Sequence, residues 1–128
     1  MAKHLPESFN VFLQIAYSDY KAAKALFEAG DSDFYEKILF FCQQSVEKFL
    51  KAYLMKLDKD FPRTHDLEEL FELIPNESFK KYYFLANVLN EHAVVLRYEE
   101  GDILEKELVS ETLESVRQFI VFMEDQLK

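Results

Sequence analysis

The apolar residues of this chain recur at three-and-four spacing, which places them along one side of an α-helix. The first such segment is predicted to run from Pro6-Glu7 to Gly30. Its apolar stripe consists of Phe9, Phe12, Leu13, Ala16, Tyr20, Ala23 and Phe27. The last segment is predicted over about residues 104–127, and its stripe consists of Leu108, Thr112, Val116, Phe119, Met123 and Leu127. Because the 128 residues include only 2 Gly and 3 Pro, there is little material for the turns of an all-β fold, and the pattern predicts an all-α protein.

Three further helices are predicted between these two. One covers about residues 34–57, after caps at Asp31, Ser32 and Asp33. A short helix follows, with Thr64 as its N-cap and acidic residues in its first turn. After Pro75-Asn76, a helix is predicted over about residues 77–98, with a stripe of Tyr82, Leu85, Ala86, Leu89, Ala93 and Leu96.

The four long helices and their short connections favour one domain over residues 1–128. A chain of this length can form one core, and its 49% apolar content is too high for a disordered chain. We expect an antiparallel up-and-down four-helix bundle, with the additional short helix packed across one end.

The charge is unevenly distributed along the chain. Residues 1–63 carry 9 basic and 9 acidic side chains, whereas residues 64–128 carry 6 basic and 15 acidic ones. The net charge of -9 argues against non-specific nucleic-acid binding, which requires clustered Lys and Arg. Any anionic ligand is therefore expected on the first half of the chain.

Neither a membrane segment nor a signal peptide is indicated, because no apolar run of about 18 residues occurs and the N-terminus is polar. The protein is therefore predicted to be cytoplasmic, without membrane contact. Cys42 falls on an apolar helix face and is predicted to be a buried, inert thiol. No His follows a Glu by three positions, so a di-metal bundle site is not predicted, and neither is a cofactor.

The second predicted helix has an unusual face opposite its core side. That face combines five polar residues with three large apolar ones: Gln43, Gln44, Glu47, Lys48, Lys51, Phe40, Leu54 and Met55. It could be a solvated stripe whose apolar residues are partly covered by neighbouring helices. It could equally be a contact surface, on which the apolar residues pack against a partner.

Three short motifs occur along the chain in a fixed order. They are Gln43-Gln44-x-x-Glu47-Lys48-x-x-Lys51-Ala52, then Arg63-Thr64-His65-Asp66-Leu67, then Leu96-Arg97-Tyr98. With these motifs, and with Ala16, Asp19 and Ala22-Ala23 in its first helix, the chain resembles the HEPN domain, the higher eukaryote and prokaryote nucleotide-binding domain. The tryptophan often seen in the first helix of that family is absent here, and Phe12 is a candidate substitute.

The resemblance implies a helical bundle that usually forms a homodimer and is commonly encoded beside a minimal nucleotidyltransferase. Such pairs often behave as toxin and antitoxin, and several family members are RNases. The family nucleases carry an Arg followed, after four to six intervening residues, by a His. The corresponding windows after Arg63, Arg97 and Arg117 contain no histidine. We therefore expect no nuclease of that type and assign no catalytic residue.

Seven residues are candidates for nucleotide binding or for an interface: Gln44, Glu47, Lys48, Lys51, His65, Arg97 and Tyr98. For His65 we favour a structural interpretation, in which the imidazole bonds to backbone or to a neighbouring carboxylate and docks the short helix. Arg97 and Tyr98 could bind a phosphate and stack on a base, or could form an ordinary helix C-terminus. The two lysines could bind phosphates, but no Gly-rich loop accompanies them.

The leading hypothesis is a homodimeric HEPN protein that acts as the non-catalytic partner of a nucleotidyltransferase in a toxin-antitoxin-like pair. It would bind nucleotide or RNA between its protomers. One alternative is an RNase toxin with a non-standard active site formed by Arg63, His65 and Arg97. Another is a plain helical interaction module without nucleotide affinity.

Overall fold

The computed structural model describes residues 7–90 and 105–128, and this part of the chain contains helices and no strands. The long helices are α1 (Glu7–Glu28), α2 (Tyr35–Lys56) and α5 (Lys106–Gln126). Shorter elements are the 3₁₀ helix η1 (Ser32–Phe34), helix α3 (Leu67–Glu72), the 3₁₀ helix η2 (Glu77–Tyr82) and a helical stretch over residues 84–90. Among the described helices, none is long and apolar enough to cross a membrane.

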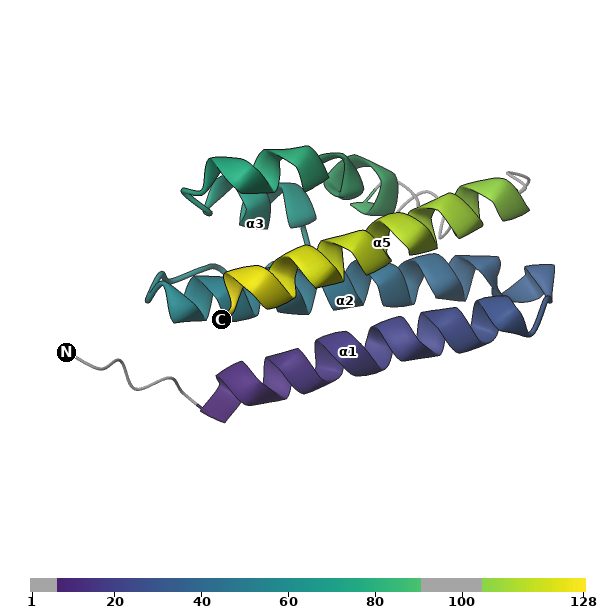
Figure 1. Ribbon diagram of the computed structural model, residues 1–128, viewed down its shortest axis with the longest axis horizontal. Coiled ribbons are helices and arrows are strands. Elements are labelled where there is room, and N and C mark those ends of the chain that lie inside the picture. Colours follow the sequence, from purple (N-terminus) through teal and green to yellow (C-terminus); the bar gives the residue numbers. More distant parts are fainter. Residues whose placement is uncertain (1–6, 91–104) are drawn as a thin grey trace.

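The successive segments alternate in direction, as Figure 1 shows. Helices α1 and α2 lie side by side and antiparallel, and α5 packs against α2. Helix α3 contacts α2 and shares a third layer with η2 and residues 84–90. The described part is thus a bundle of about four main helical segments, which confirms the predicted all-α fold.

Helix α2 is the central helix and is buried along most of its length. Two fully buried alanines of α1, Ala16 and Ala23, allow a close approach to α2. The Ser45 hydroxyl donates a hydrogen bond to the carbonyl oxygen of Ala16 at 2.7 Å. Cys42 is buried as predicted, and burial raises the pKa of its thiol to about 12. The thiolate is therefore scarcely populated at neutral pH.

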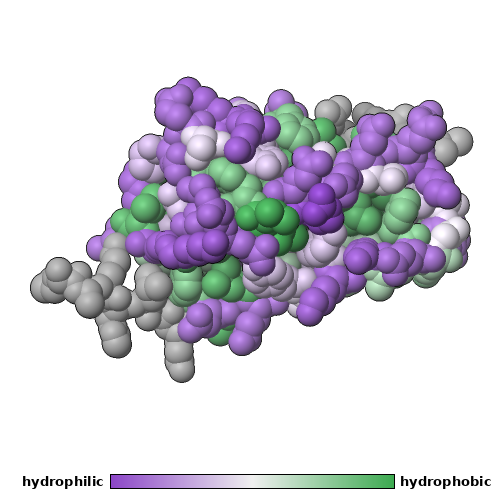
Figure 2. Space-filling view, in the orientation of Figure 1, coloured by the Kyte–Doolittle hydropathy of each residue, from purple (hydrophilic) through white to green (hydrophobic). Residues whose placement is uncertain are grey.

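Aromatic rings join the third layer to the rest of the bundle. Phe119 of α5 is the shared member, with ring centroids 6.4 Å from Phe49, 6.2 Å from Phe71 and 5.4 Å from Tyr82, each in an edge-to-face arrangement. Such pairs contribute about 0.5–1.5 kcal/mol each beyond the area that they bury. On the face seen in Figure 2, hydrophilic side chains divide the apolar surface into separate areas.

The helix predicted over residues 77–98 begins differently from the prediction. Residues 77–82 form the 3₁₀ helix η2, whose N-cap Asn76 accepts a hydrogen bond from the backbone N–H of Ser78, and the α-helical stretch starts only at residue 84. Leu85, Ala86 and Leu89 are buried, as the stripe predicted. Ala93 and Leu96 lie outside the described residues.

The buried side of α5 is rotated slightly from the predicted stripe. Leu108 is only half-buried, whereas Val109, Leu113 and Ile120 are buried. Both sets include Thr112, Val116, Phe119 and Met123. The predicted stripe missed one edge of a buried face that is wider than a single line of three-and-four spacing.

Candidate functional site

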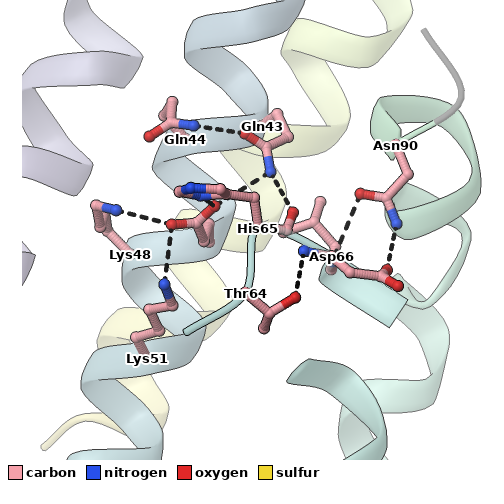
Figure 3. A network of polar contacts seen from close by, with 10 residues as sticks. Gln43, Gln44, Lys48, Lys51, Thr64, His65, Asp66 and Asn90 are labelled. Carbon is pink, nitrogen blue, oxygen red and sulfur yellow. Dashed lines mark hydrogen bonds and ion pairs between the residues drawn. The ribbon is translucent and has the colours of Figure 1, made fainter. Parts of the chain in front are cut away.

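The carboxylate of Glu47 lies at the centre of the Gln43–Ala52 motif, and its side chain is 0% exposed. Its Oε1 lies 2.8 Å from His65 Nδ1 and accepts a hydrogen bond from Gln43 Nε2 at 3.3 Å. Its Oε2 accepts hydrogen bonds from Lys48 Nζ at 2.7 Å and Lys51 Nζ at 3.2 Å. We call Gln43, Glu47, Lys48, Lys51 and His65 the Glu47 cluster (Figure 3).

Helical spacing explains how α2 assembles its part of the cluster. Gln43, Glu47 and Lys51 are four residues apart and therefore lie above one another on one side of the helix. The connection between α2 and α3 folds back over this side and brings His65 to it (Figure 3). A buried carboxylate is tolerated there because its two oxygens receive four donors.

The pKa of the Glu47 carboxyl is set by two opposing effects. Burial alone would raise this pKa, but the hydrogen bonds from Lys48 and His65 and the charges of Lys48 and Lys51 outweigh burial and lower it. Glu47 is therefore ionised at neutral pH and acts only as an acceptor. It follows that Nδ1 of His65 carries the proton of their contact.

His65 is anchored at two points although its side chain is 78% exposed. Its imidazole binds Glu47, and its backbone carbonyl oxygen accepts a hydrogen bond from Gln43 Nε2 at 2.7 Å. These contacts dock the start of α3 on α2. The contact with a neighbouring carboxylate that the structural interpretation expects is present, and Glu47 supplies the carboxylate.

The N-cap of α3 is Asp66, and the prediction of Thr64 was wrong. The Asp66 carboxylate accepts from the backbone N–H of Glu68 at 3.0 Å, whereas Thr64 Oγ1 accepts from the N–H of Asp66 itself. Asn90 supports this cap with Nδ2 2.8 Å from Asp66 Oδ1, and its own Oδ1 accepts from the N–H of Leu67 at 3.3 Å. Sequence reasoning missed Asn90, because nothing local marks its distant partner.

The two lysines of the cluster are held by rings as well as by Glu47. Lys48 Nζ lies 5.7 Å from the ring centroid of Phe12, and Lys51 Nζ lies 5.8 Å from that of Phe61. Such cation-π contacts offset part of the hydration that a lysine ammonium loses when it is covered. Lys51 is accordingly buried and Lys48 half-buried.

Asp19 of α1 adds a second carboxylate beside the cluster. Burial raises the pKa of Asp19, the charge of Lys48 lowers it and the charge of Glu47 raises it, with an upward shift as the result. When both carboxylates are ionised, they balance the two lysines and the group has no net charge.

Neither interpretation of the mixed face of α2 describes its buried half. Gln43, Glu47, Lys51 and Leu54 are covered by this chain's own residues and form neither a solvated stripe nor a partner contact. The remainder is more open: Phe40 is 40% exposed, and Gln44, Lys48 and Met55 are half-buried. Gln44 lies one step from the cluster and donates to Gln43 Oε1 at 2.8 Å.

The cluster brings together Glu47, Lys48, Lys51 and His65 of the predicted site residues. Arg97 and Tyr98 lie outside the described residues. Within the described part, no group of three or more His, Cys, Asp or Glu residues could hold a metal ion. Every buried polar side-chain atom there has a hydrogen-bond partner.

Comparisons with known proteins complete this description. Searches of the curated proteins and of the solved structures found no match to the chain. The family model of the HEPN domain matches residues 9–126, which include all of the Glu47 cluster. The chain therefore belongs to the HEPN domain family.

Proposed function

We propose that this HEPN protein is the non-catalytic partner of a minimal nucleotidyltransferase in a toxin-antitoxin-like pair, and that it acts as a homodimer. The observation that carries the proposal is the saturation of the Glu47 cluster. The RNA cleavage performed by the family nucleases uses a cation available to the phosphate and an imidazole placed for proton transfer. Both lysines and the Nδ1 proton of His65 are instead used by Glu47.

The electroneutrality of this region supports a protein partner over a polyanion. When Asp19 and Glu47 are both ionised, they balance Lys48 and Lys51, and a nucleic-acid strand then meets no net positive charge there. The excess of acidic residues in the second half of the chain is likewise suited to a basic protein surface.

The outer face of α1 supports the homodimer. Val11 and Ile15 are 48% and 36% exposed and lie one turn apart. The face continues at the same spacing through small residues: Ser18, Ala22 and Ala25. In an antiparallel pair of α1 helices that cross near Ser18, the turn that holds Val11 would face the turn of Ala25, and the turn that holds Ile15 would face the turn of Ala22. Large residues would then face small ones, an arrangement that packs closely across a two-fold axis.

Co-expression with a minimal nucleotidyltransferase of the kind proposed as its partner tests the partnership. We expect the two chains to elute together from a sizing column as a stable complex. Glu47→Gln should weaken the complex only to the extent that it unfolds the protein, because the cluster is internal. Independent elution of two folded proteins would contradict the proposal.

RNase activity is the second candidate function, and the observation that favours it is the exposure of the His65 ring. With Nδ1 protonated toward Glu47, the Nε2 atom of a neutral imidazole is an acceptor at an exposed ring. Incubation of the purified protein with cellular RNA distinguishes the two functions. We expect intact RNA after long exposure, whereas cleavage that His65→Asn abolishes would establish the RNase.

Nucleotide binding requires its own test, because Arg97 and Tyr98 lie outside the described residues. Binding to the folded state raises stability by about 2.7 kcal/mol when ligand is present at a hundredfold excess over Kd. A thermal unfolding series with ATP and magnesium therefore separates a nucleotide-binding partner from a plain helical interaction module. The midpoint would rise for the first and stay constant for the second.

A further inference from the structure

A cavity of about 290 Å³ lies between α3 and η2, away from the Glu47 cluster. Its apolar lining includes three aromatic residues, Phe71, Phe79 and Tyr83, and its charged lining consists of Glu72, Glu77 and Lys80. The volume is at the lower end of the range for small-ligand pockets, roughly 300–1,000 Å³, and is suited to a single large side chain.

The aromatic lining is held in place by the core. Phe71 and Phe79 are both buried. The ring centroid of Phe79 lies 4.7 Å from that of Tyr53 and 4.9 Å from that of Phe122. The ring of Tyr83 lies 5.5 Å from that of Phe71. A ligand would therefore meet a preformed aromatic surface with little ordering of side chains.

The charges around the cavity favour a cation. The carboxylate of Glu77 is balanced by Lys80 at 3.0 Å. In the described part of the chain, the carboxylate of Glu72 is in no ion pair, and its Oε1 accepts a long hydrogen bond from the Tyr83 hydroxyl at 3.4 Å. Burial raises the pKa of Tyr83, and the charges of Glu68 and Glu72 raise it further, so two carboxylates lie close enough to this hydroxyl to act on it.

We infer that this cavity is a binding site for an arginine side chain presented by a protein partner. A planar guanidinium can stack on an aromatic ring while it donates hydrogen bonds to a carboxylate, here Glu72. Lysine has a compact ammonium that uses the same charge without the stacking geometry. The acidic second half of the chain would attract the basic segment that carries the arginine. The inference does not depend on whether that partner is a nucleotidyltransferase.

Titration with a blocked Gly-Arg-Gly peptide, followed by the aromatic NMR signals of the intact protein, tests the site. We expect saturable shifts of the Phe71, Phe79 and Tyr83 rings with a Kd in the millimolar range, about -4 kcal/mol at 1 mM. The control peptide carries citrulline, which has nearly the same shape and no charge. It should bind at least several-fold more weakly. Absence of saturable shifts, or equal binding of the two peptides, would overturn the inference.

Two variants change the charge at the cavity in opposite directions. Glu72→Gln should weaken binding of the arginine peptide several-fold, and Lys80→Gln should strengthen it, because it removes a positive charge from the lining. Both side chains are exposed, so neither variant should impair folding. Glu36→Gln is the matched control, since Glu36 is exposed and does not line the cavity. If Glu72→Gln and Lys80→Gln both bind as Glu36→Gln does, the site is not electrostatic and the inference fails.

Discussion

At the scale of single residues, Glu47 is the most deeply buried charged side chain of the described part. Its burial was not predictable from the sequence, because a Glu within a Gln-Lys-rich run is usually exposed. Only the return of the α2–α3 connection over this face takes it out of water. By contrast, the position of His65 before a short helix did indicate that its imidazole bonds to a neighbouring group. The sequence did not identify Glu47 as that group.

We predict that Glu47→Gln lowers the free energy of unfolding by about 3 kcal/mol, because it leaves two covered lysines without their anion. Urea unfolding followed by circular dichroism measures the change. Glu114→Gln is the control, since Glu114 pairs with Arg117 on the exposed surface of α5 and should have little effect. Equal stability of the two variants would show that the cluster contributes no more than a surface ion pair.

The lowered pKa of Glu47 also predicts a pH dependence. Because the folded-state pKa lies below the unfolded one, the stabilisation is fully present above the ordinary carboxyl pKa. It is lost as the pH falls through the lowered folded-state pKa, where the carboxylate is protonated. The difference in urea midpoint between wild type and Glu47→Gln should therefore shrink as the pH falls below about 5, where the Glu47 carboxylate begins to be protonated. A difference that grew below that pH would contradict the sign of this shift.

At the scale of elements, α1, α2 and α5 begin and end within about two residues of the predicted limits, because long stripes of three-and-four spacing define them well. The 3₁₀ turn η2 could not be predicted in this way. Over six residues, 3₁₀ and α-helical spacing place side chains too similarly to be distinguished. The support that the Asp66 cap receives from Asn90 was likewise not predictable, because Asn90 is 24 residues away in the sequence.

Asp66→Ala should destabilise the protein by about 1 kcal/mol or more, since it removes the cap of α3 and the partner of Asn90. Hydrogen exchange should accelerate over residues 67–72 and leave α1 unchanged. Asp31→Ala provides a comparison, because Asp31 caps only the three-residue η1. Uniform acceleration along all helices would show that the cap supports the whole fold and not α3 in particular.

At the scale of the whole molecule, the proposed homodimer gives the clearest measurement. The wild-type protein should have a solution mass twice that of its 15.2 kDa chain. Ile15→Lys should convert it to a monomer, because it places a charge in the middle of the α1 face. Val121→Lys is the control, as Val121 is 54% exposed on α5. A wild-type monomer, or a dimer that only Val121→Lys disrupts, would refute pairing through α1.

The docking of α3 through side chains has a consequence for how the protein opens. Residues 57–66 join α2 to the third layer and are mostly exposed, so they bury little apolar surface. The hydrogen bonds of His65 with Gln43 and Glu47 therefore hold this connection against α2. Segments of this kind open at a lower free energy than the core helices. A protease should therefore cut first between α2 and α3. The rate of that cleavage would measure how often His65 separates from Glu47 and Gln43.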